Sequence, residues 1–250
     1  AGIVGEDGAT HQGLYDIAFL RTLPNMVIMA PKDENELRHM LKTAVYHKGP
    51  AAMRYPRGSG LGVPIDAEMK ELEIGKGEVL KEGSDIAIFA YGHTVDWAMT
   101  VSAMFEKEGV SVAVINARFA KPVDKDLIVQ YANSARCLVT TEEHSLKGGF
   151  GSAVLEALQE EQAIVPVKCI GLDDIVLEHG SPAIQRKDLK LDPEGLFETI
   201  MTFYGSVAEM AASGNGKKWV AGNGKKAIIG NGTNGNGKKH DLTVKQTLNG

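Results

Sequence analysis

The start of the chain concentrates side chains that can do acid–base chemistry. Residues 5–13 read Gly-Glu-Asp-Gly-Ala-Thr-His-Gln-Gly, so Asp7 and His11 lie in one short stretch. Histidine is the side chain whose ordinary pKa lies closest to neutral pH, and glycines let a backbone turn tightly and approach a ligand. The alternative is a surface turn with a solvated histidine. Because aspartate, threonine, histidine and glutamine gather in one loop, we favour a functional loop with Asp7 and His11 as candidate residues.

Two arginines form a second cluster, at the end of a short apolar run. Residues 51–53 (Ala-Ala-Met) predict a buried strand, and Arg-Tyr-Pro-Arg-Gly follows at 54–58. Ligands of open α/β sheets collect beyond the carboxyl ends of strands, and a guanidinium group can grip phosphate with two hydrogen bonds. The pair Arg54 and Arg57 therefore suits a phosphate, and ordinary surface ion pairs are the alternative.

These clusters need a scaffold, and the rest of the chain alternates apolar strands with amphipathic helices. Residues 26–30 predict a short strand, and Asp33 with Glu36 predicts the start of the helix after it. In the second half, four apolar strands separated by three helices predict a mostly parallel, doubly wound α/β sheet. The expected strands are 85–90, 110–115, 137–140 and 165–170, and the expected helices are 94–108, 124–133, 149–161 and a closing helix at 193–203.

Glu142, Glu143 and His144 follow one of these predicted strands and precede a glycine-rich stretch. A loop opening onto a helix there could hold an anion, but the phosphate-loop pattern GxxxxGK[ST] is absent. We therefore favour a structural role for these residues, with dimer contacts in this domain. His179 has no partner nearby in the sequence and is interpreted as an ordinary loop histidine.

Composition and charge exclude some classes of function for this chain. The chain has 250 residues, of which 43% are hydrophobic, and a net charge of −5. Residues 206–250 contain seven lysines and two acidic residues, so residues 1–205 carry a strongly negative net charge. This negative charge argues against a nucleic-acid partner. The segment Gly-Asn-Gly-Lys-Lys recurs at 214–218, 222–226 and 235–239, and we expect a flexible tail over 205–250. No apolar run is long enough to cross a membrane, and the two cysteines predict buried apolar side chains rather than a disulfide or metal site.

Several motifs together resemble the 1-deoxy-D-xylulose-5-phosphate synthases of the thiamine diphosphate-dependent transketolase superfamily. The motifs are GEDGATHQG at 5–13, PKDENELRHML at 31–41 and RYPRG at 54–58, followed in order by IGKG at 74–77, RFAKP at 118–122 and TEEH at 141–144. The first motif is shared with transketolases, whereas RYPRG and the helix start PxDENEL are more specific. The resemblance extends to about residue 204.

The resemblance implies how the chain is divided. Residues 1–58 would be the C-terminal half of a pyrimidine-binding domain, 59–74 a linker and 75–204 a transketolase C-terminal domain, before the tail. In this family the segments that bind thiamine diphosphate and Mg²⁺ lie upstream. We therefore expect a C-terminal fragment without cofactor-binding or metal-binding residues, inactive alone. A cytoplasmic homodimer is implied for the complete enzyme, or a plastid protein if a transit peptide has been lost.

The resemblance also implies a reaction, in which pyruvate is decarboxylated and its two-carbon unit is transferred to glyceraldehyde 3-phosphate. The product is a precursor of isoprenoids, thiamine and pyridoxal. By motif match, His11 would bind the intermediate or acceptor and assist proton transfer, Asp7 would orient an acceptor hydroxyl, and Arg57 would bind its phosphate. Arg54 and Tyr55 are further candidates, although residues at a strand end also serve packing.

Three alternatives remain open. The chain could belong to another transketolase-type enzyme, or to the β subunit of an E1-type 2-oxoacid dehydrogenase, in which a separate chain supplies the missing part. The THQG loop argues against the second, because that family would be expected to place a different histidine loop there. The third alternative is a non-enzymatic dimerisation module made from the C-terminal domain.

Overall fold

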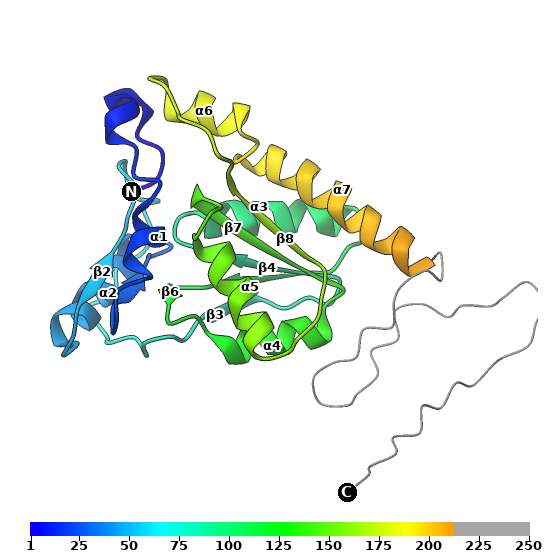
Figure 1. Ribbon diagram of the computed structural model, residues 1–250, viewed down its shortest axis with the longest axis horizontal. Coiled ribbons are helices and arrows are strands. Elements are labelled where there is room, and N and C mark those ends of the chain that lie inside the picture. The colour runs from blue at the N-terminus through cyan, green and yellow to red at the C-terminus, as the bar shows by residue number, and fades with distance from the viewer. Residues whose placement is uncertain (213–250) are drawn as a thin grey trace, which may run out of the picture.

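The larger part of the protein is built around a five-stranded sheet, in a computed structural model that describes residues 1–212 (Figure 1). The strand order is β3-β5-β4-β7-β8, with β3 antiparallel to β5 and the other neighbours parallel. The mostly parallel sheet predicted from the sequence is therefore confirmed, and β3 is an additional edge strand. The strands are β3 (Glu78–Lys81), β4 (Ile86–Ala90), β5 (Val112–Asn116), β7 (Cys137–Ser145) and β8 (Val167–Leu172).

Helices cover both faces of this sheet, as a doubly wound fold requires (Figure 1). Successive side chains of a strand point to opposite faces. In β4, Ile86 and Ile88 face one core, with α3 (Thr94–Lys107) and α7 (Pro193–Ala212). Ala87 and Phe89 face the other core, with α4 (Lys125–Ser134) and α5 (Phe150–Glu160). Because both faces are buried, these strands have continuous apolar sequences rather than alternating ones.

The N-terminal part is smaller and joins the larger part through a shared sheet. Its strands β1 (Val27–Met29) and β2 (Ala51–Met53) are parallel, and β6 (Phe119–Lys121) from the second half adds to β1 antiparallel. The side chain of Asp33 accepts a hydrogen bond from the Glu36 amide and caps α2, as predicted. The remaining elements before β1 are the 3₁₀ turns η1 (Gly5–Asp7) and η2 (Ala9–His11) and the short helix α1 (Asp16–Leu20); α2 spans Glu34–Tyr46.

The predicted linker at 59–74 contains no helix or strand, yet its backbone is bound to α2 along its length. Glu34 accepts hydrogen bonds from the amides of Leu61, Gly62 and Val63. Further along the helix, His39 accepts from the Lys70 amide and Thr43 from the Leu72 amide. Polar side chains of α2 thus replace the hydrogen bonds that regular structure would have supplied.

Besides the unpredicted strands β3 and β6, three helices and strands differ from the sequence predictions. β7 continues to Ser145, so Glu142, Glu143 and His144 lie inside a strand and not in a loop after it. α7 continues to Ala212, because Val207 packs into the core beneath it, and residues 205–212 of the expected tail are therefore helical. The helix α6 (Pro182–Asp188) was not predicted. The rest of the tail, 213–250, lies outside the described residues. Within residues 1–212, no helix is long and apolar enough to cross a membrane.

Candidate functional site

The loop that carries Asp7 and His11 is closed at its base and exposed at its tip. Gly2 and Gly13 exchange two backbone hydrogen bonds of 2.8 and 2.9 Å. Between them the chain makes the two 3₁₀ turns η1 and η2, joined by Gly8, whose φ of +87° favours glycine. The hydrogen bonds between Gly2 and Gly13 fix the two ends of the loop, while the side chains of Asp7 and His11 are exposed to solvent.

Asp7 and Arg57, fifty residues apart in the sequence, meet in the structure. Arg57 Nη1 donates a hydrogen bond to Asp7 Oδ2, and both side chains are partly exposed, at 57% and 36%. His11 lies in the next turn, with its Nδ1 atom 3.0 Å from Thr10 Oγ1. Tyr55 is also exposed. The structure therefore brings the two predicted clusters to one exposed region, where an arginine can use its further N–H groups to bind an anion.

Arg54 behaves differently from Arg57, because it is buried. Its Nε and Nη2 atoms donate to both oxygens of Asp16 at 2.9 and 3.2 Å, and Nη2 also lies 3.1 Å from the Gly13 carbonyl. Burial acts to lower the pKa of Arg54, but the hydrogen bonds and charge of Asp16 raise it above its ordinary value. These donors are already used, which favours a role in holding the loop base over a role in ligand binding.

Glu142 occupies the helix N-terminus that the sequence had suggested as an anion site. Its carboxylate accepts hydrogen bonds from the amides of Phe150 and Gly151, at 2.6 and 2.8 Å. The side chain is completely buried, and burial raises its pKa to about 7 despite these two donors. The first turn of α5 is therefore filled by the protein's own carboxyl group.

His144 fixes the helix that follows the loop. Its Nε2 atom accepts a hydrogen bond from the Ile17 amide at 3.1 Å, and its Nδ1 atom lies 2.7 Å from the Ser145 carbonyl. An accepting Nε2 and a donating Nδ1 require the neutral imidazole, and burial lowers the pKa of His144 accordingly. The ring thus satisfies a free amide at the start of α1.

Glu143 contacts the segment that enters the loop. It accepts a hydrogen bond from the Ile3 amide at 3.0 Å, and it also contacts His93 and Arg186. Burial alone would raise the pKa of Glu143, but these two neighbours lower it to about 2. Through Glu143 and His144, β7 therefore binds the chain both before and after the loop. The TEEH motif was noticed in the sequence, but nothing in it showed that its partners would be residues 3 and 17.

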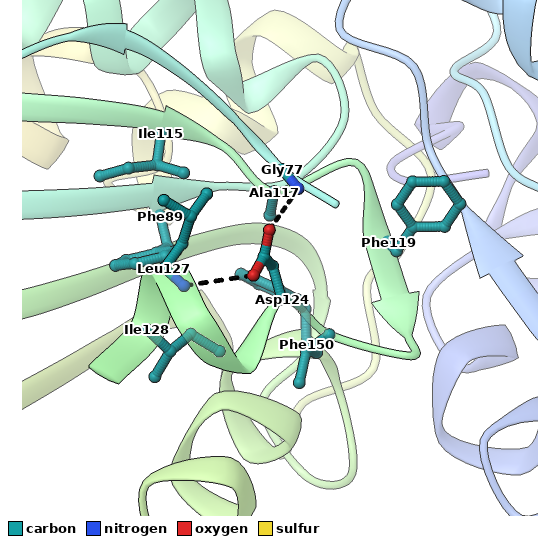
Figure 2. Close-up of a pocket in the computed structure, with 10 residues that line it drawn as sticks. Gly77, Phe89, Ile115, Ala117, Phe119, Asp124, Leu127, Ile128 and Phe150 are labelled. Carbon is teal, nitrogen blue, oxygen red and sulfur yellow. Dashed lines mark hydrogen bonds between the residues drawn. The ribbon is translucent and has the colours of Figure 1, made fainter. Parts of the chain in front are cut away.

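In the described part of the chain, the cavity that borders the site is small: it is lined by Arg54, Tyr55 and His93 and has a volume of about 10 Å³. Among residues 1–212, no three His, Cys, Asp or Glu side chains are grouped so as to hold a metal ion. A cavity of about 10 Å³ lies in the second core, among Phe89, Leu127, Phe150 and the carboxylate of Asp124 (Figure 2). It has room for a single water at most and is lined mainly by apolar side chains. Asp124 there binds the amides of Gly77 and Leu127, which is a structural task.

Comparison with known proteins identifies both parts of the chain. Residues 1–61 match the family model of the transketolase pyrimidine-binding domain, and residues 75–196 match that of the transketolase C-terminal domain. Over 207 residues the chain is 56% identical to the 1-deoxy-D-xylulose-5-phosphate synthase of Thermosynechococcus vestitus, covering 82% of this chain but 32% of that protein. It is 52% identical over 196 residues to synthase 1 of Geobacter sulfurreducens, covering 78% of this chain and 31% of that protein. The chain thus spans less than a third of the length of these relatives.

Solved structures give the same picture of the fold. A structure described as a split gene transketolase, an inactive beta4 tetramer, superposes with a TM-score of 0.67 at 32% identity, covering 79% of this chain and 63% of that one. A transketolase mutant from Pichia stipitis superposes with a TM-score of 0.60 at 21% identity, covering 88% of this chain and 30% of that one, and shows likeness of fold alone.

Proposed function

Because this chain belongs to the transketolase family, we propose that it forms the C-terminal part of a thiamine diphosphate-dependent 1-deoxy-D-xylulose-5-phosphate synthase. The complete enzyme would condense pyruvate with glyceraldehyde 3-phosphate and release CO₂. The observation that carries this proposal is the meeting of Asp7 and Arg57 on the exposed loop region, in a chain 56% identical to a protein of that name. A homodimer in the cytoplasm is part of the same proposal.

The chain's own residues would handle the acceptor substrate. Arg57 would bind its phosphate, because a guanidinium group donates several charge-assisted hydrogen bonds. Asp7, held by Arg57, would accept a hydrogen bond from an acceptor hydroxyl. His11, one turn away, would bind the intermediate or acceptor and move a proton at an oxygen. Arg54, through Asp16 and Gly13, would keep the loop base in place.

Thiamine diphosphate supplies the carbanion chemistry of this class of enzyme. Among residues 1–212, no three His, Cys, Asp or Glu side chains are grouped so as to hold a metal ion. The resemblance to the synthases implies that the segments that bind the cofactor lie upstream, and on that ground we assign no cofactor ligand to this chain. The cofactor and Mg²⁺ would be bound by parts of the enzyme outside it, and the chain alone would be inactive.

A separately encoded chain could supply those parts. The likeness to a split gene transketolase, whose inactive tetramer is a solved structure, favours this arrangement as the second candidate. The two arrangements differ in whether the missing segments are continuous with residue 1. Sequencing the DNA upstream of that codon decides between them, because an in-frame segment encoding GDG followed by Asn indicates one chain.

The proposal predicts a selective effect of Arg57→Ala. In a chain completed with the N-terminal two thirds of the Thermosynechococcus vestitus relative, this substitution should raise the KM for glyceraldehyde 3-phosphate by roughly ten- to a hundredfold, the value of one or two lost charge-assisted hydrogen bonds. The KM for pyruvate should change little, because pyruvate has no phosphate. Arg57→Lys should recover part of the loss, since an ammonium group keeps the charge but not the planar fork.

Steady-state kinetics with each substrate varied separately test this prediction. The matched control is Arg136→Ala, which removes another exposed arginine paired with an aspartate, Asp85, at 3.0 Å. The control should leave both KM values unchanged. An equal loss for both substrates in Arg57→Ala would contradict the phosphate assignment, and absence of product from the completed wild-type chain would contradict the proposed reaction.

A further inference from the structure

Glu143 is the point where three separate segments meet. Its carboxylate has no exposed surface and accepts hydrogen bonds from Ile3 N at 3.0 Å and from Arg186 Nε at 2.6 Å. His93 Nε2 lies 3.2 Å from the same carboxylate. A buried carboxylate needs such partners, because removal from water is costly unless opposite charge and donors replace it. Ile3 belongs to the buried segment that leads directly into the loop of Asp7 and His11.

Arg186 brings the short helix α6 to this point. The segment that includes α6 packs on the loop, and α6 lies beside η1 (Figure 1). The Gly180 amide donates to the Gly5 carbonyl at 3.0 Å, and a side chain at Gly5 would overlap Gln185. In the same segment, Gln185 Nε2 donates to the Glu178 carbonyl at 2.6 Å. A Cβ atom built on Gly8 would lie 4.0 Å from the side chain of the exposed His179.

Leu177 and Leu191 pack into the core on either side of α6, but the contacts made by the helix itself are polar. None of its residues is buried, so it contributes no side chain to a hydrophobic core. Arg186 is its anchor: besides Glu143, its guanidinium lies 5.6 Å from the ring centre of Trp97. Loss of this arginine should therefore release α6 and the loop locally, while the sheet keeps both of its cores.

We propose that Glu143 and Arg186 are positioning residues for the loop that carries Asp7 and His11. Their buried ion pair holds residues 2–4, which enter the loop, and the segment packed on the loop in one arrangement, so the C-terminal domain sets the geometry of the site. The contribution to catalysis rests on the proposed function, whereas the contribution to loop order does not.

Hydrogen–deuterium exchange on the chain itself tests the structural part. In Arg186→Met, which keeps an apolar stem against Trp97, amides of residues 3–13 and 177–188 should exchange at least about tenfold faster than in the wild type. Amides of β5, in the sheet, should be unchanged. Arg186→Lys should lie between, since it restores the charge, and Lys187→Met, an exposed cation on the same helix, should match the wild type. Equal exchange in Arg186→Met and Lys187→Met overturns the proposal, and so does acceleration of equal size in β5.

Kinetics in the completed enzyme test the catalytic part. Arg186→Met should lower kcat by about tenfold or more, as expected when catalytic groups lose their alignment. Arg186→Lys should restore part of it, and Lys187→Met should leave it unchanged. Normal kcat in Arg186→Met overturns the positioning role. If the completed wild-type chain makes no product, the proposed function fails, and the exchange experiment still decides whether Arg186 orders the loop.

Discussion

Two groups of polar residues in this protein contain the same chemical types and differ in burial. The exposed loop cluster consists of Asp7, His11 and Arg57, and the buried β7 cluster consists of Arg54, Glu142, Glu143 and His144. In the first, an arginine–carboxylate pair faces solvent and retains donors for a ligand. In the second, each side chain binds backbone groups of another segment. Burial and hydrogen-bond saturation, rather than residue type, separate groups that can bind a substrate from groups that hold them in place.

The largest expected contrast is between the two arginines of the RYPRG motif. Arg54→Ala should lower the free energy of unfolding by about 3–5 kcal/mol, because it leaves Asp16 partly buried without its cation. Arg57→Ala should lower it by no more than about 1 kcal/mol, since its ion pair is largely exposed and screened. Chemical denaturation of both variants measures this. Similar losses for the two would break the distinction between the clusters.

Two adjacent carboxylates of the buried β7 cluster, Glu142 and Glu143, should make the free energy of unfolding depend on pH in opposite directions. The pKa of Glu142 is raised from 4.5 to about 7, so between these values the folded state holds a proton that the unfolded state has lost. Stability from this group therefore falls as pH rises through that window, by roughly 3 kcal/mol at most. The pKa of Glu143 is lowered to about 2, so its stabilisation is complete above pH 4.5 and is lost as pH falls towards 2.

Denaturation curves at several pH values check this pair. Relative to the wild type, Glu142→Gln should gain stability as pH rises from 4.5 to 7, since it removes the group that resists ionisation. The deficit of Glu143→Gln should stay constant over the same range. Glu160→Gln, at the exposed C-terminal end of α5, is the control and should show neither trend. A constant difference for Glu142→Gln would mean that this carboxyl group ionises normally in the fold.

The sequence was sufficient to predict those features of the fold that depend on local patterns of residues. The capping of α2 by Asp33, the strand at 51–53 and the parallel sheet all follow from spacing and apolar runs, and each is confirmed, although the strand at 51–53 is half-buried and not buried as predicted. β3 and β6 were missed because they have four and three residues and include charged side chains. The extension of β7 was missed for a different reason. Its polar residues are satisfied by Ile3 and Ile17, more than a hundred positions away, and no local pattern shows such partners.

The smallest expected contrast is between two histidines, one from each cluster. His144→Ala should lower the free energy of unfolding by about 1–3 kcal/mol, because it leaves the buried amide of Ile17 without an acceptor. His11→Ala should change it by no more than about 0.5 kcal/mol, as expected for an exposed side chain. His144→Gln offers a side-chain oxygen that can accept from the Ile17 amide and should recover part of the loss. Chemical denaturation of the three variants at pH 7.5 makes the comparison. If His144→Ala were as stable as His11→Ala, the bond to Ile17 would not be what holds α1. The end of β7 would then not fix the helix behind the loop.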